Sequence, residues 1–284
     1  MAEEHPEPTD SFELLAHSTR MAVLQELFES LRATPDDPAV QFSELRERVD
    51  APDSGNFSYH LDRLVGWYVE ETDSGYRLAS RGYSVALALE SGRYGRDETP
   101  DPVESLGDCL FCGGPVDARI EDGHSELRCP NGHRSYVHLR PSALETLSRD
   151  GLRKLVALRL YGSAQQTLHG VCAACDEDVA TTGEYHDDVG GHVFTDRCSG
   201  CGAQLALTAG LCAIQDLDVA RFLRDRGADP RTTPPWEFEC CRAGAETVVS
   251  EDPLELRVEV ERDGDHLSVT LDASGEVVRV SHHR

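Results

Sequence analysis

Lysine is almost absent from this chain of 284 residues, in which Lys154 is the only lysine among 27 basic residues. Acidic residues number 52, so the formal net charge is -25 at pH 7. A dense carboxylate surface with almost no lysine is typical of proteins from extreme halophiles, because it keeps them soluble in concentrated salt. We therefore expect a halophilic archaeon as the source; an acidic protein from an organism that lives in ordinary salt is the alternative.

Long apolar runs are also missing. No stretch approaches the roughly 18 apolar residues of a membrane-spanning helix, and the acidic N-terminal segment MAEEHPEPTDSF lacks the apolar core of a signal peptide. The chain contains no phosphate-binding glycine loop, no nucleophile elbow and no HExxH motif. These absences predict a cytoplasmic protein that has no membrane partner and is not an enzyme.

The N-terminal third has the apolar periodicity of helices, followed by a sequence pattern typical of a β-hairpin. A first helix is predicted over Phe12–Leu31, and Ser43 is expected to cap a short second helix, SELRERV. A third helix is predicted over Gly55–Val65, and Asp73-Ser74-Gly75 lies between two runs of strand-forming residues, which is typical of a hairpin. Apolar spacing predicts one buried stripe on the third helix, formed by Phe57, Leu61, Leu64 and Val65.

The segments LAHSTRMAVLQEL, FSELRERV and SGNFSYHLDRLVGWYVEETDSGYRLASRG resemble the ArsR-type winged helix-turn-helix family of transcriptional regulators over residues 11–90. The resemblance implies that the third helix reads the major groove of double-stranded DNA and that the hairpin contacts the backbone or the minor groove. It also implies a homodimer, for which Ser84–Leu89 is the candidate dimer helix. By resemblance, the DNA-contacting residues are Ser54, Asn56, Ser58, Tyr59, His60 and Arg63, with Arg77 in the hairpin. His60 suits a core position equally well.

The charge of this region argues against DNA binding. Five arginines and eight acidic residues lie between Val40 and Arg81, for a local charge of about -3, whereas DNA-binding domains are usually basic. At molar ionic strength, however, the screening length is only about 3 Å. Long-range repulsion then vanishes, so the acidic charge is weak evidence against DNA binding in a halophile.

Two cysteine clusters have the spacing of metal sites. The later one consists of Cys172-Ala-Ala-Cys175 and Cys198-Ser-Gly-Cys201, separated by 22 residues, which predicts a zinc ion held by four thiolates. The earlier one pairs Cys109-Leu-Phe-Cys112 with a second knuckle in which His133 lies four residues after Cys129. We predict that these four residues hold a second zinc ion; His124 or His138 is the alternative to His133. Both sites are expected to be structural.

Cys212 and the vicinal pair Cys240 and Cys241 lie outside these clusters and are expected to be small buried residues.

The prediction is an α+β fold: an N-terminal winged helix-turn-helix, two zinc-ribbon-like modules and a C-terminal antiparallel β-meander. The segments are a disordered acidic tail over 1–10, the winged helix-turn-helix over 11–92, a linker over 93–107, the first module over 108–140, a helical connector over 141–170, the second module over 171–210, and a helix plus the meander over 211–284.

The expected function is a DNA-binding transcriptional regulator, whose C-terminal region binds an effector or a protein partner. The alternatives are a factor that docks on the transcription machinery through protein contacts, and a zinc enzyme.

Overall fold

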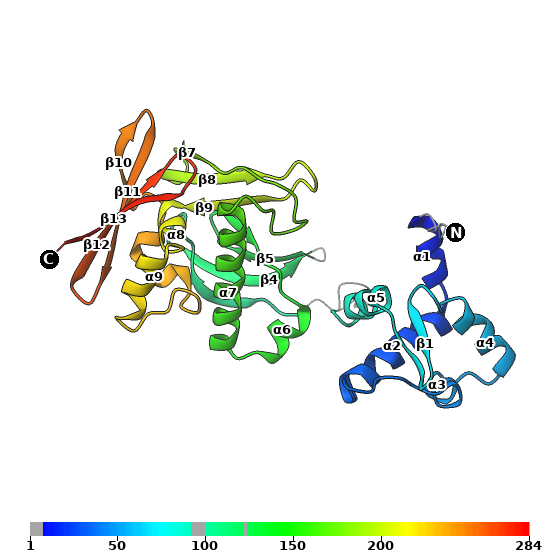
Figure 1. Cartoon of the computed structure of the whole chain (residues 1–284). Coiled ribbons are helices and arrows are strands. Elements are labelled where there is room, and N and C mark those ends of the chain that lie inside the picture. Colours follow the sequence, from blue (N-terminus) through cyan, green and yellow to red (C-terminus); the bar gives the residue numbers. More distant parts are fainter. Residues whose placement is uncertain (1–7, 92–99, 122–123, 284) are drawn as a thin grey trace. The chain divides into compact units, whose positions relative to one another are not determined.

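The computed structural model describes residues 8–91, 100–121 and 124–283, and its chain divides into two compact units, Met1–Asp97 and Glu98–Arg284. Figure 1 shows the elements of both units. Within the described residues no helix combines the length and the apolar character needed to cross a membrane.

The N-terminal unit packs its helices around one core and adds a two-stranded antiparallel hairpin (Figure 1). Its core includes Leu24, Leu45, Phe57 and Leu61, all fully buried. Of the predicted stripe, Phe57 and Leu61 are buried on the third helix; the helix ends at Asp62 rather than Val65, so the buried Leu64 and the partly buried Val65 lie beyond it. The elements in chain order are α1 Pro8–Leu15, α2 Ser18–Ala33, α3 Phe42–Arg48, α4 Ser54–Asp62, β1 Val69–Thr72, β2 Gly75–Leu78 and α5 Ser80–Glu90.

Three local predictions for this unit were wrong. The expected first helix is interrupted at His17, whose side chain accepts a hydrogen bond from the Thr19 N–H and so caps α2. Ser43 is not a cap, because α3 begins one residue earlier, after Gln41, whose side chain donates to the Ser74 carbonyl. Of the predicted disordered tail, residues 1–7 lie outside the described residues, and residues 8–10 already belong to α1.

In its described residues the C-terminal unit contains three antiparallel sheets in which sequence neighbours pair (Figure 1). The first sheet is β3 Val103–Asp108, β4 Pro115–Glu121, β5 His124–Arg128 and β6 Arg134–Tyr136. The second is β7 Thr182–His186, β8 Gly191–Arg197 and β9 Gln204–Thr208. The third is the predicted meander, β10 Glu246–Glu251, β11 Leu254–Arg262, β12 Asp265–Asp272 and β13 Val277–His283. Together with the hairpin β1–β2, these sheets confirm the mixed α+β class.

The linker predicted over 93–107 is wrong at its end, because β3 begins at Val103. Its residues 93–99 lie outside the described residues. Leu106 is fully buried against the first sheet and α7, and Gly107 pairs with Val116 of β4. The acidic residues and prolines of this segment are typical of a linker, so the sequence did not predict β3.

The segment expected to be a helical connector is a core element instead. It forms α6 Pro141–Thr146 and α7 Arg149–Leu168, with Ser148 as the N-cap of α7. Leu152 and Val156 of α7 pack with the first sheet, whereas Tyr161 and Ala164 belong to the core of the second and third sheets. Helix α7 therefore joins both cores of the unit.

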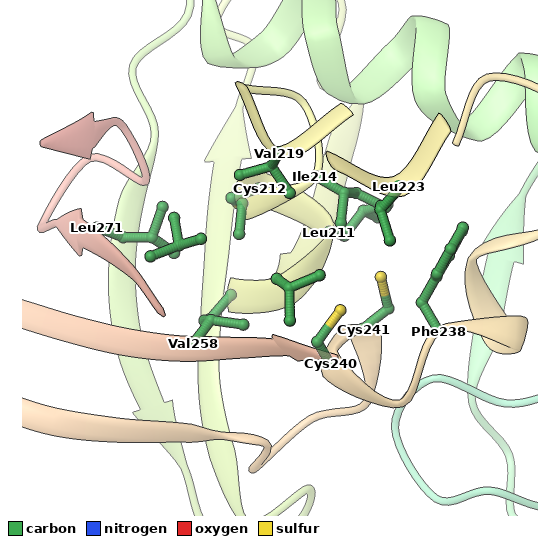
Figure 2. Close-up of a cluster of buried hydrophobic side chains, with 14 of the residues drawn as sticks. Leu211, Cys212, Ile214, Val219, Leu223, Phe238, Cys240, Cys241, Val258 and Leu271 are labelled. Atoms are coloured by element: carbon green, nitrogen blue, oxygen red, sulfur yellow. The ribbon is translucent and has the colours of Figure 1, made fainter. Parts of the chain in front are cut away.

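The larger of these two cores contains the three remaining cysteines. Cys212 lies on α8 Ala209–Ala213, and Cys240 and Cys241 lie on the short turn η2 Glu239–Cys241, which follows η1 Pro235–Glu237. Figure 2 shows them among apolar side chains of α8, α9 Leu217–Arg224, β11 and β12. All three are buried, and burial raises the pKa of the Cys212 and Cys241 thiols. Their prediction as buried, unreactive residues agrees with this environment.

Candidate functional sites: two metal centres and an exposed helix

The second cysteine cluster forms around two knuckles, one before β7 and one in the turn between β8 and β9. In each knuckle a backbone N–H bonds back to the first cysteine carbonyl, from Asp176 to Cys172 and from Gly202 to Cys198. Both of those donors have positive φ, 64° and 75°, which turns the chain around the four sulfurs. The Sγ atoms of Cys172 and Cys201 are 3.8 Å apart, and those of Cys175 and Cys198 are 3.5 Å apart.

These distances fit one tetrahedral ion. Zinc–thiolate bonds of about 2.3 Å at tetrahedral angles place neighbouring sulfurs about 3.8 Å apart. The four predicted ligand residues therefore form a group that could hold a metal ion.

The first cluster forms a second such group around the first sheet. Cys109 and Cys112 follow β3, and Cys129 and His133 lie between β5 and β6. The Cys112 and Cys129 sulfurs are 3.7 Å apart, and His133 Nδ1 lies 3.7 Å from Cys109 Sγ and 3.5 Å from Cys129 Sγ. A zinc ion with bonds of about 2.3 Å to sulfur and about 2.05 Å to nitrogen requires about 3.6 Å between the two atom types.

The knuckle of Cys129 and His133 has three residues between its ligands, one more than the cysteine knuckles. Gly132 has φ of +90° and turns the chain so that the His133 ring reaches the sulfurs. Sequence reasoning missed Asn131, whose side-chain amide donates to Cys112 Sγ at 3.4 Å. The four predicted residues form the group, and His124 and His138 are not members of it.

Both groups offer four protein ligands, which fill a tetrahedral shell and leave no position for a reacting water. The first group joins the β3–β4 turn to the β5–β6 turn, and the second joins the segment before β7 to the β8–β9 turn. An ion bound in either group would therefore cross-link these chain segments.

Helix α4 carries five of the seven predicted DNA contacts, and a sixth, Arg63, is the residue directly after the helix. Asp53 caps the helix by accepting hydrogen bonds from the N–H groups of Gly55 and Asn56, at 2.8 and 3.3 Å. Phe57 and Leu61 anchor the buried face. The opposite face leaves Ser54, Asn56, Tyr59 and Arg63 exposed, with Tyr59 58% exposed, and Ser58 partly exposed.

His60 does not belong to this exposed face. It is buried and its ring stacks on that of His17 at 3.8 Å. Desolvation by burial, followed by the charges of His17 and Arg20, lowers the pKa of His60. Of the two interpretations, the core position fits the structure, and His60 is removed from the set of candidate DNA contacts.

Arg77 lies on the hairpin and is exposed, but it is already engaged. Its guanidinium forms an ion pair with Glu70 on the paired strand, at 2.8 Å. A phosphate contact by Arg77 would have to compete with this carboxylate.

Comparison with known families finds two matches, one in each unit. Residues 8–89 match the family described as "Domain of unknown function (DUF7347)", and residues 106–277 match the family "Domain of unknown function (DUF7351)". The two matches fall within the N-terminal and C-terminal units respectively. No curated protein matches the chain. Because the second match covers more than half of the sequence, the chain belongs to the family DUF7351.

Proposed function

We propose that this chain is a DNA-binding transcriptional regulator, in which the N-terminal unit is an ArsR-like winged helix-turn-helix. The observation that carries the proposal is the exposed face of α4. Ser54, Asn56 and Tyr59 stand on this helix, and Arg63 directly follows it; the helix lies between the short α3 and the hairpin β1–β2. Side chains of these types read base edges and phosphates when the N-terminal turns of a helix enter the major groove.

We further propose that each metal group holds one zinc ion with a structural role. Thiolate-rich, tetrahedral groups select zinc among the common divalent ions. Zinc at these positions would stabilise the two small sheets of the C-terminal unit, which would leave the reading of DNA to the other unit.

The acidic charge around α4 sets the conditions under which DNA binding is expected. Asp53 and Asp62 stand on or beside the exposed face, and their repulsion of phosphate decays over about 3 Å in molar salt but over about 10 Å at 0.1 M salt. We therefore expect binding to depend on short direct contacts and to tolerate molar potassium chloride.

A second candidate is a factor that binds a protein of the transcription machinery. The observation that favours it is the neutralisation of Arg77 by Glu70, which removes a cation from the hairpin. Tyr59, which is 58% exposed, would then anchor a protein interface rather than a base contact. Co-purification of RNA polymerase subunits without operator binding would favour this candidate.

We also propose a homodimer that uses α5, the helix that contains Ser84–Leu89. Tyr83 on this helix is 43% exposed although its ring also packs near Phe28. A dimer would present two α4 helices to two half-sites of an operator.

The test is an electrophoretic mobility shift in molar potassium chloride with the chain's own promoter region. Wild-type protein is expected to bind this DNA in preference to a scrambled duplex. Arg63→Ala and Tyr59→Ala should each weaken binding by about fivefold or more, since one direct base contact contributes about 1–3 kcal/mol. Arg32→Ala is the matched control, because Arg32 is exposed at the end of α2 and bonds Glu29. Absence of sequence preference, or equal affinity of all variants, would refute the proposal.

A further inference from the structure

Asn131 links the two knuckles of the first metal group, although it is not one of the four ligand residues. It lies in the turn between Cys129 and His133, where Gly132 has φ of +90°. Its side-chain amide donates a hydrogen bond to Cys112 Sγ of the other knuckle, at 3.4 Å. The amide therefore bears directly on a sulfur that would bind the metal ion.

Cys112 is the ligand residue through which this group meets the solvent. Its side chain is exposed, whereas Cys109 and Cys129 are buried and His133 is partly buried. Water and chelators would reach a bound ion most readily at the exposed sulfur. We therefore expect the release of an ion from this group to begin with loss of its bond to Cys112.

A hydrogen-bond donor on this sulfur opposes that first step. Three thiolates and one neutral imidazole leave one excess negative charge around a divalent ion. An N–H that points at the sulfur stabilises this charge and fixes the orientation of the side chain toward the ion. Removal of a residue that bonds a metal ligand in this way typically weakens metal binding by about 10–100-fold.

The second metal group provides a comparison within the same chain. Its exposed cysteine is Cys201, whose sulfur lies beside that of Cys172. In the part of the chain that the structure describes, no side-chain amide or hydroxyl donates to the Cys201 sulfur. Ser199 lies between the two ligands of the same knuckle and is exposed, but its hydroxyl does not bond a sulfur there. The donor from a side chain is thus particular to the first group.

From these contacts we infer that Asn131 retains the metal ion of the first group, by holding the exposed Cys112 thiolate in its ligating position. Asn131 is a positioning residue and not a ligand. The inference rests on the zinc ions proposed above and does not depend on DNA binding.

Transfer of zinc from the full chain to an excess of pyridylazoresorcinol, a chelating dye, measures this retention. Asn131→Leu keeps the approximate size of the side chain but removes the donor. It should speed the release of one of the two ions by about tenfold or more and leave the release of the other unchanged. Ser199→Leu is the matched change in the second group and should leave both rates as in wild type.

Cobalt substitution distinguishes this role from a merely structural one. The energy of the sulfur-to-cobalt charge-transfer band depends on the sulfur lone pairs, which the N–H of Asn131 would stabilise. Asn131→Leu should therefore move part of the band to longer wavelength, and Ser199→Leu should not move it. A backbone amide spectrum that is unchanged outside the knuckles establishes that each variant is folded.

Wild-type release rates in a folded, zinc-loaded Asn131→Leu variant would overturn the inference alone. Faster release with an unmoved charge-transfer band would also overturn it, because the effect would then be structural. A wild-type chain that binds no zinc would overturn it together with the proposed zinc sites.

Discussion

Asp53 is expected to stabilise the N-terminal unit by capping α4, the helix that carries the proposed reading face. Its carboxylate accepts hydrogen bonds from the N–H groups of Gly55 and Asn56. Loss of an N-cap costs about 1 kcal/mol, within a range of about 0.5–2. For a unit of this size, each kcal/mol lowers Tm by about 4–8 °C. Asp53→Ala should therefore lower the Tm of this unit by about that amount.

The companion variant Asp53→Asn separates the two contributions of the carboxylate. Asparagine keeps the acceptor but loses the charge, which contributes about 0.3–1 kcal/mol at a helix N-terminus in dilute salt. Molar salt screens that charge, so Asp53→Asn should unfold close to wild type there, while Asp53→Ala stays destabilised.

The assay is thermal unfolding followed by Trp67 fluorescence, in a Trp236→Phe background, so that only the N-terminal unit is observed. Asp36→Ala in the exposed loop between α2 and α3 is the control and should not change Tm. Equal Tm for Asp53→Ala and wild type would refute the capping argument, as would an Asp53→Asn variant as unstable as Asp53→Ala in molar salt.

Three further predictions follow from packing, protonation and metal binding. Gly210→Ala should lower the urea midpoint of the C-terminal unit, because the added Cβ would overlap a backbone carbonyl of η2. Gly162→Ala on α7 is the control and should leave the midpoint unchanged, because the space around Gly162 is open. The pKa of His60 is lowered from 6.5, so the unfolded chain binds more protons below that pH. The urea midpoint of the N-terminal unit should therefore fall as the pH drops below 6.5, and it should fall less in His60→Gln. An equal fall in both proteins would contradict the lowered pKa of His60. Metal analysis should find two zinc ions per wild-type chain, one in Cys201→Ser and two in Cys212→Ser, and unchanged zinc in Cys201→Ser would contradict the assigned ligands.

The metal groups could be predicted from the sequence because their information is local. Two residues between paired cysteines, followed by a turn residue with positive φ (Gly113, Asp176 or Gly202), already bring two thiolates to one point. The meander was equally readable, since alternating residues and the Asp263-Gly264 turn specify neighbouring strands that pair with each other. In both cases the partners are close in the chain.

Features that depend on distant partners could not be predicted. The break between α1 and α2 accompanies the stacking of His17 on His60, and the strand character of Leu106 depends on burial against a helix far along the chain. Helix α7 was predicted to be a connector because its sequence shows that it has apolar faces but not which other segments pack against them.

The central claim is that the exposed face of α4 reads DNA. The most direct measurement is genome-wide occupancy of the tagged protein in its own cells, wild type beside the double variant Tyr59→Ala and Arg63→Ala at equal abundance. The account predicts discrete promoter peaks that share a sequence motif, and their loss in the double variant. Occupancy without a motif, or peaks that the double variant retains, would contradict it.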